Sequence, residues 1–344
     1  MEPDLDALAR FMDEQGLGEG PIEDVDRLSG GTQNVMLRFT RAGRGYVLRR
    51  GPEHLRPHSN AAMRREIQVL RALGATDVPH PQLIADHPDG EVAYYLMEPV
   101  DGYSAQVTLP DRVRADPAER RAMGLAMADA LGRLASVDHR AVGLGDVGQP
   151  EDFLERQIPR WLKEIERYRE LDGYPGFAIP GVKEIVSWLQ AHFPAAWTPG
   201  LMHGDFHLGN VMFAPDEPRI AAIVDWEMCT IGDPLLDLGW MIASWPGRAP
   251  ALDRIAGELG AAGGLPDPDE LVAAYAERSG RDVSQVEFYR VLACFKLGIV
   301  LEGTNARACA GKAPQAMGDR LHAMSVALFA QALEVIGWPP RAAR

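Results

Sequence analysis

The sequence predicts an α+β protein with two lobes, a small β-rich first lobe and a larger, mainly helical second lobe. Two observations support this fold class. The chain has 344 residues, of which 46% are hydrophobic, and this is enough apolar material for two cores. Its early segments alternate between the periods of strands and helices, whereas most segments after residue 102 have helical spacing. We therefore expect the first lobe at residues 1–98, a hinge at 99–102 and the helical lobe at 103–344.

The first lobe is expected to be a sheet with one helix. Apolar residues alternate with polar ones over residues 34–40, a Gly-containing turn follows at 41–45, and residues 46–50 form the returning strand of a hairpin. A loop then leads to residues 60–73, where apolar side chains recur at helical spacing and a glycine follows. Residues 92–97 include two tyrosines and predict a further strand that runs into the hinge.

The second lobe is expected to consist mainly of helices, with one exception. The segment from 201 to 227 begins with a loop rich in Gly, His and Asp, and continues into a short apolar strand at 220–224 that ends at Asp225. A Gly- and Pro-rich stretch at 260–268 predicts a loop. Helical spacing is found over residues 118–137, 151–170, 182–193, 268–278, 284–303 and 316–336.

The composition disfavours several kinds of partner. The formal net charge of -14 argues against nucleic acid, and it slightly favours cationic ligands such as amines. No apolar run is long enough for a membrane span, and the acidic start of the chain is unlike a signal peptide. We therefore expect a cytoplasmic protein that does not bind membranes. Three widely spaced cysteines fit reduced thiols, and the oligomeric state is not indicated by the sequence.

The strongest chemical signal is the run His-Gly-Asp-Phe-His-Leu-Gly-Asn at residues 203–210. Asp205 precedes Asn210 by five residues, and Asp225 follows at the end of the apolar strand. Catalytic loops of protein kinases have this order of a base Asp, a metal-binding Asn and a second metal-binding Asp after a strand. A plain polar turn with capping residues is the alternative, but six matching positions in order disfavour it.

Gly-Asp-Pro at residues 232–234, followed by Asp237, completes a longer pattern. Together with residues 203–210 and 224–227, it resembles the aminoglycoside/choline phosphotransferase family, and looks most like the kinase-like domains also found fused to acyl-CoA dehydrogenases. The resemblance implies a protein-kinase-like fold and transfer of the terminal phosphate of ATP, or of GTP, to a hydroxyl group with the help of Mg²⁺. The acceptor stays open among aminoglycosides, choline-like amines, sugars and hydroxyacyl compounds.

The resemblance gives each polar residue of the loop an expected role. Asp205 would accept or orient the proton of the acceptor hydroxyl. Asn210 and Asp225 would supply oxygen ligands to Mg²⁺, a hard cation that bridges nucleotide phosphates. His207 stands where many protein kinases carry a phosphate-facing lysine, so we expect it to contact the transferred phosphoryl group. By the same analogy, His203 braces the backbone of the loop and does not react.

The acids that follow Asp225 are expected to have mainly structural roles. Pro234 should begin a helix that Asp233 caps. The resemblance implies that Asp237 turns inward and braces the catalytic loop. Glu227 could be an auxiliary metal ligand or a group behind the ligands, and the sequence does not decide between these roles.

The first lobe supplies candidate nucleotide-binding residues. Gly30, Gly31 and Asn34 lie where this family carries a short nucleotide loop, and glycines allow backbone amides to approach phosphates. Arg49 stands at the strand position of the usual kinase lysine and keeps the positive charge. Glu66 lies in the middle of an apolar helical stripe, and a buried acid needs a partner. We therefore predict an ion pair between Arg49 and Glu66.

The hinge is expected to bind the nucleotide base through its backbone. The backbone groups of Glu98 and Val100 would hydrogen-bond an adenine edge, a role about which side-chain identity says little. Two residues depart from the family pattern, because Leu208 replaces a common proline and Arg49 replaces lysine. Neither change removes a charge that catalysis needs.

Two other functions remain open from the sequence. A nucleotide-binding pseudokinase without turnover would share the fold, although Asp205, Asn210 and Asp225 are all retained. A metal-dependent hydrolase could use His203, Asp205 and His207 as ligands, but such enzymes need further ligands in recognisable motifs. The sequence has no Walker A motif and no Rossmann fingerprint, which disfavours P-loop ATPases and dinucleotide-dependent dehydrogenases.

Overall fold

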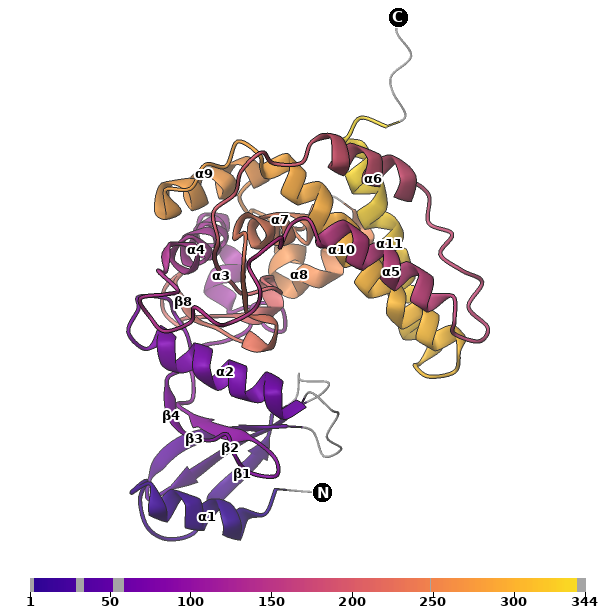
Figure 1. The fold of residues 1–344 in the computed structure, drawn as a ribbon. Coiled ribbons are helices and arrows are strands. Elements are labelled where there is room, and N and C mark those ends of the chain that lie inside the picture. The colour runs from indigo at the N-terminus through magenta and orange to yellow at the C-terminus, as the bar shows by residue number, and fades with distance from the viewer. Residues whose placement is uncertain (1–2, 29–33, 52–58, 248, 339–344) are drawn as a thin grey trace, which may run out of the picture.

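The structure, a computed structural model, describes residues 3–28, 34–51, 59–247 and 249–338. Figure 1 shows two lobes, a small one built around a sheet and a larger one built of helices. The predicted α+β class and the two-lobed architecture are therefore confirmed. None of the helices within these ranges is both long and apolar enough to cross a membrane.

The first lobe is an antiparallel sheet between two helices. In the described residues the sheet has five strands in the order β1-β2-β3-β5-β4, and all neighbours are antiparallel. In Figure 1, α1 and α2 lie on opposite faces of this sheet. The elements are α1 (Leu5–Glu14), β1 (Glu23–Arg27), β2 (Val35–Arg41), β3 (Arg44–Arg50), α2 (Ser59–Leu73), β4 (Leu83–His87) and β5 (Tyr94–Met97).

Both faces of the sheet are buried. Successive side chains of a strand point to opposite faces, and on β3 Leu48 belongs to the core beneath α1 whereas Val47 belongs to the core beneath α2. The alternating residues that the sequence predicted on β2, which are Val35, Leu37 and Phe39, all join the α1 side. Because β3 is packed from both sides, it gives Arg49 a rigid support.

The hairpin turn between β2 and β3 is shorter than the sequence predicted. The two strands pair as far as Arg41 and Arg44. Only Ala42 and Gly43 remain in the turn, with positive φ angles of 50° and 73°. Two-residue turns with positive φ at both positions match the right-handed twist of the strands that they join.

Helix α1 was not predicted from the sequence. Asp4 caps its first turn by accepting a hydrogen bond from the Ala7 amide at 2.9 Å. Arg41 is 1% exposed and fastens the helix to the sheet, since its guanidinium donates to the Ala9 carbonyl at 3.0 Å and to Asp13 Oδ1 at 2.5 Å. An arginine used as a buried anchor breaks the apolar pattern from which such contacts are predicted.

The second lobe contains all six helices that the sequence predicted, with shifted ends. The helix predicted from residue 151 begins only at Gln157, and the one predicted to end at 303 continues to Cys309. Helices α3 and α8 were not predicted, and α8 extends into the loop expected at 260–268. The helices are α3 (Asp111–Ala115), α4 (Pro117–Ser136), α5 (Gln157–Tyr168), α6 (Val182–Ala191), α7 (Leu235–Ala243), α8 (Pro250–Ala262), α9 (Pro268–Ser279), α10 (Val286–Cys309) and α11 (Gln315–Val335).

Two short antiparallel ribbons carry the segment that the sequence singled out. β6 pairs with β9 and β7 pairs with β8. The loop 203–210 runs from β6 to β7, and Asp225 follows β8 directly after Val224. The strands are β6 (Gly200–Met202), β7 (Val211–Phe213), β8 (Ile220–Ile223) and β9 (Thr230–Gly232).

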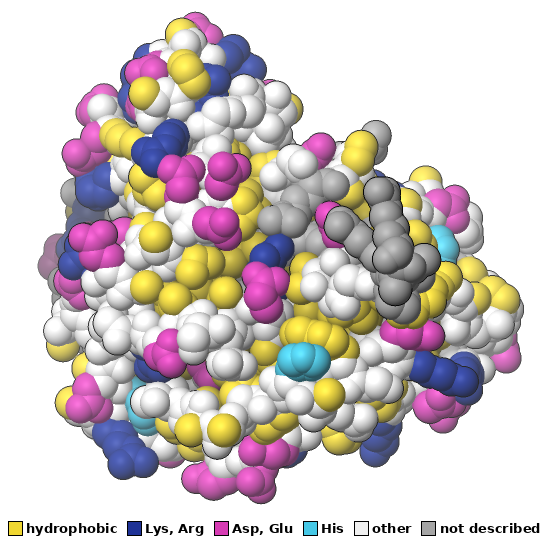
Figure 2. Space-filling view, turned by 90° about the horizontal axis from the view of Figure 1, so that it is seen from above, with side chains coloured by type: hydrophobic (Ala, Val, Ile, Leu, Met, Phe, Trp, Pro, Cys, Tyr) yellow, Lys and Arg dark blue, Asp and Glu magenta, His cyan; other side chains and the backbone are white. Residues whose placement is uncertain are grey.

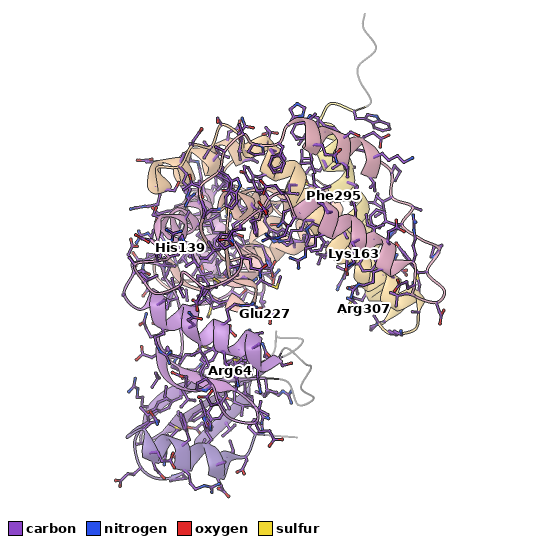
Figure 3. The ribbon with its side chains drawn as sticks, viewed as in Figure 1. Arg64, His139, Lys163, Glu227, Phe295 and Arg307 are labelled. Carbon is purple, nitrogen blue, oxygen red and sulfur yellow. The ribbon has the colours of Figure 1, made fainter. Side chains whose placement is uncertain are left out.

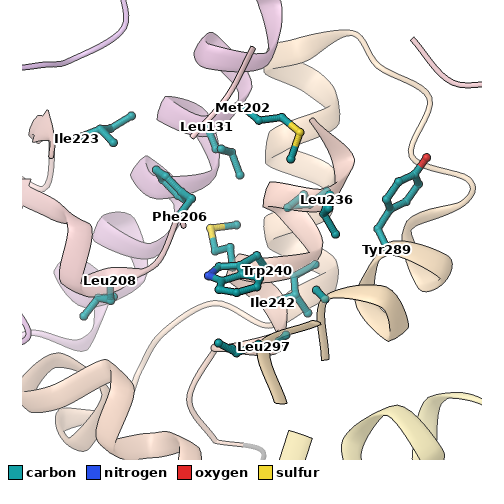
Figure 4. Packing of buried hydrophobic residues seen from close by; sticks show 14 of the residues in the cluster. Leu131, Met202, Phe206, Leu208, Ile223, Leu236, Trp240, Ile242, Tyr289 and Leu297 are labelled. Atoms are coloured by element: carbon teal, nitrogen blue, oxygen red, sulfur yellow. The ribbon is translucent and has the colours of Figure 1, made fainter. Parts of the chain in front are cut away.

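An apolar core lies behind this segment. Figure 4 shows Phe206 and Leu208, which come from the loop itself, together with Trp240 of α7 and Leu131 of α4. Phe206 is 0% exposed and Leu208 is 4% exposed. The loop is therefore fixed to the helical lobe by two of its own side chains, as burial of large apolar groups requires.

Candidate active site

Alternate residues of the loop 203–210 have opposite environments. Phe206 and Leu208 are buried, whereas the side chains of Asp205 and His207 are 36% and 22% exposed. The apolar residues thus anchor the loop and leave the two predicted catalytic side chains accessible. The structure brings these two together, with 3.6 Å between Asp205 Oδ2 and His207 Nε2.

His203 and Asp237 hold the backbone of this loop from within the core. His203 Nε2–H donates to the Val224 carbonyl at 2.9 Å, and its Nδ1 accepts from the Asp205 amide at 3.3 Å. The Asp237 carboxylate accepts from the amides of His203 and Gly204 at 2.6 and 2.9 Å. Burial lowers the pKa of His203 and raises the pKa of Asp237 to about 6. Both predicted bracing roles are confirmed.

These contacts argue against a transition-metal site made of His203, Asp205 and His207. Both ring nitrogens of His203 are already hydrogen-bonded to the backbone. His207 Nδ1 accepts from the Gly209 amide at 3.0 Å. In the part of the chain that the structure describes, no three His, Cys, Asp or Glu side chains are grouped so as to hold a metal ion. The metal-dependent hydrolase therefore has no ligand set in these residues.

Asp205 is oriented by two hydrogen bonds. Its Oδ1 accepts from the indole N–H of Trp240 at 3.1 Å, and its Oδ2 accepts from the side-chain amide of Asn210 at 3.1 Å. Burial by itself would raise the pKa of Asp205, but the hydrogen bond and charge of His207 outweigh it and hold that pKa below its ordinary value. The carboxylate is therefore ionised at neutral pH and can act as a proton acceptor.

Asn210 connects the loop to the strand end that carries Asp225. Its side-chain amide also donates to the Asp205 carbonyl at 2.9 Å, and its own carbonyl accepts from the Val224 amide at 2.9 Å. Asp225, which directly follows Val224, has a left-handed backbone with φ of 65°. Few residues with a side chain adopt this conformation, and Asp and Asn do so more readily than most. Asp205, Asn210 and Asp225 thus lie in one connected unit.

Arg49 joins the two lobes. Its Nε lies 3.0 Å from Glu66 Oε2, and its Nη2 lies 2.7 Å from Asp225 Oδ1. Arg49 and Glu66 are 6% and 2% exposed. Burial disfavours both charges, but at Arg49 the charges of Glu66, Tyr95 and Asp225 together outweigh burial and raise the pKa of the guanidinium, which stays protonated. The predicted Arg49–Glu66 ion pair is confirmed, and the contact with Asp225 was not predicted.

Glu227 adds a further carboxylate beside Arg49, with 3.9 Å between Oε2 and Arg49 Nη2. In Figure 3 it lies where the two lobes meet. The side-chain amide of Asn34 donates to Glu227 Oε2 at 3.5 Å, and Arg65 donates to the Glu227 carbonyl at 2.9 Å. Burial and the charge of Asp225 raise the pKa of Glu227. Asn34 from the predicted nucleotide loop therefore reaches the acidic end of the site.

The other predicted nucleotide contacts are placed only in part. Gly30 and Gly31 lie outside the described residues. The Glu98 amide donates to the Gln82 carbonyl at 2.9 Å, so it is not free for a ligand. Among the residues that the structure describes, no backbone hydrogen bond uses the Glu98 carbonyl or the Val100 amide. These two groups are therefore open to a hydrogen-bond partner.

Sequence reasoning missed two residues beside Asp205. Trp240 donates to its carboxylate, and Lys296 Nζ lies 4.5 Å from the centre of the Trp240 ring. Trp240 follows Asp237 by three residues in α7 and therefore shares its helix face, so the spacing could have revealed it. Lys296 comes from α10, and no spacing in the sequence connects that helix with the loop.

A family profile described as the phosphotransferase enzyme family matches residues 24–276, well over half of the chain. The chain belongs to this family. The matched range includes every residue predicted for the site. The protein is also 29% identical over 325 residues to acyl-CoA dehydrogenase family member 10 of Mus musculus, a match that covers 92% of this chain and 29% of the relative. This phosphotransferase family member thus spans less than a third of that relative's length.

Solved structures share the fold. A candidate aminoglycoside phosphotransferase from Ralstonia eutropha is 32% identical, with a TM-score of 0.78 over 96% of this chain and 98% of that chain. A thermostable mutant of aminoglycoside phosphotransferase APH(4)-Ia, in a ternary complex with AMP-PNP and hygromycin B, is 17% identical, with a TM-score of 0.56 over 93% and 98%. The second likeness shows the fold alone. The protein-kinase-like fold expected for this phosphotransferase family member is confirmed.

Proposed function

We propose that this protein transfers the terminal phosphate of ATP to a hydroxyl group of a small molecule. The observation that carries the proposal is the distance of 2.7 Å between Arg49 Nη2 and Asp225 Oδ1. It places the cation expected to bind phosphates beside a residue expected to bind Mg²⁺. Asp205 and Asn210 belong to the same connected unit, so the proposed base, metal ligands and phosphate-binding cation form one site.

Asp205 is proposed to accept the proton of the acceptor hydroxyl. Trp240 and Asn210 fix its two oxygens, and its lowered pKa keeps it ionised. A positioned base of this kind contributes about 10² to 10⁴ in rate. His207 lies 3.6 Å from Asp205 Oδ2 and is close enough to contact the phosphoryl group during transfer.

Asn210 and Asp225 are proposed to hold Mg²⁺. The described residues fit this ion because they offer amide and carboxylate oxygens but no complete protein cage, and Mg²⁺ commonly keeps waters and phosphates as its remaining ligands. Glu66, Asp225 and Glu227 surround one cation, Arg49, so a negative excess remains for a divalent ion to offset. When bound, Mg²⁺ would neutralise charge on the nucleotide phosphates.

The first lobe is proposed to bind the nucleotide. Arg49, held by Glu66, would contact the phosphates, and the loop at residues 30–34 would approach them with backbone amides. The Glu98 carbonyl and the Val100 amide would pair with the base. ATP is the expected nucleotide, and GTP, whose base offers a different donor and acceptor pattern, is the alternative.

The experiment is a nucleotide-consumption screen with ATP and GTP, with and without Mg²⁺. The acceptors are aminoglycosides, choline analogues, sugars and hydroxyacyl compounds. Asp205→Asn should lower kcat by about 10² to 10⁴ and leave the thermal stabilisation by Mg-ATP intact. Asp172→Asn is the matched control, because Asp172 is exposed and lies outside the site.

Three outcomes separate the candidates. Transfer that depends on Asp205 supports the proposal. Thermal stabilisation by Mg-ATP without transfer to any acceptor would instead identify a pseudokinase. An Asp205→Asn variant with unchanged kcat would remove Asp205 from the mechanism.

A further inference from the structure

A cavity of about 520 Å³ lies beside the catalytic loop. Its wall includes Gly204, the residue directly before Asp205, and Met202 at the end of β6. Trp161 of α5 and Lys296 of α10 form other parts of the wall. A small molecule held there would lie against the catalytic loop at the residue before the proposed base.

The charge of this cavity is opposite to that of the chain. Four of its lining side chains are cationic, and no Asp or Glu lines it within the described part of the chain. The whole sequence has 49 acidic and 35 basic residues, and on the face shown in Figure 2 the two signs are interspersed. An acid-free wall with four cations is therefore a local feature of this site. The cations are Arg65, Arg156, Arg160 and Lys296.

Two of these cations lie near an aromatic ring and not in a direct ion pair, although the charges of Asp237 and Asp205 also act on Lys296. The Arg160 guanidinium lies 5.2 Å from the centre of the Trp161 ring, and Lys296 Nζ lies 6.0 Å from the same centre. In the described ranges neither side chain forms an ion pair. Arg156 differs because it donates to backbone carbonyls, among them that of Gln149 at 2.5 Å. Neither side chain is held by a direct ion pair, so both are available to a ligand. Burial, and to a smaller extent the charge of Arg160, lower the pKa of Lys296, and an anion beside both side chains would offset this effect.

One indole connects these cations with the proposed base. Trp240 donates to Asp205 Oδ1 at 3.1 Å, and Lys296 Nζ lies 4.5 Å from the centre of the Trp240 ring. Arg65, which also lines the cavity, has a buried Nε without a hydrogen-bond partner in the described residues. Asp205 does not line the cavity itself, but its neighbour Gly204 does, and Trp240 connects Asp205 with the cavity cation Lys296.

We propose that this cavity is the acceptor site and that the acceptor is a hydroxyl compound with an anionic group, either a carboxylate or a phosphate. The anionic group binds Arg160 and Lys296, and the hydroxyl reaches Asp205. This inference rests on the proposed phosphate transfer. The hydroxyl oxygen forms a bond to the terminal phosphorus of ATP, the bond from that phosphorus to the bridging oxygen breaks, ADP leaves, and the hydroxyl proton passes to Asp205. The inference opposes the preference for amines that the net charge suggested.

The test measures binding and turnover in parallel. Short hydroxycarboxylates and glycerol phosphate are the anionic probes, and amino alcohols of similar length are the cationic comparison. Binding is followed by thermal shift of the full chain without nucleotide, and turnover by ADP release. The variants are Arg160→Glu and Lys296→Met. Lys163→Glu is the control, because Lys163 lies on α5 in Figure 3 but does not line the cavity.

Arg160→Glu should raise the Kd and KM of the best anionic probe about tenfold or more, since hydrogen bonds to charged groups are worth that much. Lys296→Met should act in the same direction, and Lys163→Glu should change neither value. Stabilisation by Mg-ATP should be unaffected by Arg160→Glu. If carboxylate probes bind and phosphate probes do not, or the reverse, the result identifies the anionic group.

Two results would overturn the inference. One is turnover of amino alcohols by the wild type with no binding of anionic probes. The other is anion binding that Arg160→Glu and Lys296→Met leave unchanged. Anion binding that depends on Arg160, with no phosphate transfer to any compound, would support the ligand class and count against the proposed function.

Discussion

Two charge clusters of opposite sign lie near the catalytic loop. On the side of the first lobe, Glu66, Asp225 and Glu227 surround the single cation Arg49. Beside the loop, four cations from α2, the start of α5 and α10 line a cavity to which no described acid contributes. The first arrangement fits a divalent ion with a nucleotide, and the second fits an anionic acceptor. The comparison teaches that a net charge of -14 does not report the charge that a ligand meets.

The largest expected effect comes from a substitution in the acidic cluster, at Asp225. Asp225→Asn should abolish the thermal stabilisation by Mg-ATP and lower kcat/KM by about 10³, because a metal ligand contributes several kcal/mol to the transition state. Thermal shift and steady-state kinetics measure the two effects, with Asp172→Asn as control. A variant that is still stabilised by Mg-ATP would exclude Asp225 as a metal ligand and break the comparison.

The next effect concerns stability. Arg49→Met leaves Glu66 buried without its partner and should lower the free energy of unfolding by about 3 to 5 kcal/mol. The double variant Arg49→Met/Glu66→Leu should recover most of this loss, because both buried charges are then gone. Urea titrations of the two variants and the wild type measure the difference. If the single variant is as stable as the wild type, Arg49 is not the cation that neutralises Glu66.

A smaller effect on kcat is expected from a substitution of Trp240, which contacts both Asp205 and Lys296. Trp240→Phe removes the hydrogen bond to Asp205 Oδ1 and should lower kcat about tenfold, with little change in the KM for Mg-ATP. Kinetics with saturating Mg-ATP measure this effect. Lys296→Met keeps the indole and should instead raise the KM for an anionic acceptor. Equal effects of both variants on both constants would mean that Trp240 and Lys296 only support the fold.

The smallest effect is that of salt, and it should differ between the two sides. Arg156 and Arg160 are exposed, so ionic strength should screen them, whereas Arg49 and Glu66 are buried. Between about 0.05 M and about 0.5 M salt, the KM for an anionic acceptor should rise a few-fold. The difference in stability between the wild type and Arg49→Met should stay constant. A KM that does not depend on salt would contradict electrostatic recognition of the acceptor.

The sequence predicted those parts of the site that depend on local order. Asp205 and Asn210 lie on one loop, and the alternation with buried Phe206 and Leu208 explains why a short motif suffices to place them. The Arg49–Glu66 pair could be predicted because a carboxylate in an apolar helical stripe needs a cation. These inferences require one element, or two elements that are close in the chain.

The parts that the sequence did not predict depend on distant contacts. Lys296 reaches Trp240 only because α10 packs against α7. Helix α1 is fastened by Arg41, a charged residue that the apolar pattern does not reveal. The sign of the acceptor cavity likewise arises from side chains of three separate helices. Composition averages over these places and therefore does not report the sign of this cavity.

The left-handed backbone at Asp225 restricts which residues can replace it without backbone strain. Asparagine and glycine tolerate that conformation, whereas β-branched residues are strained there. A related chain that had given up phosphate transfer but still needed its shape would be expected to carry one of these two residues at this position. The residue at position 225 would therefore indicate, from the sequence alone, whether a relative has lost the proposed phosphate transfer.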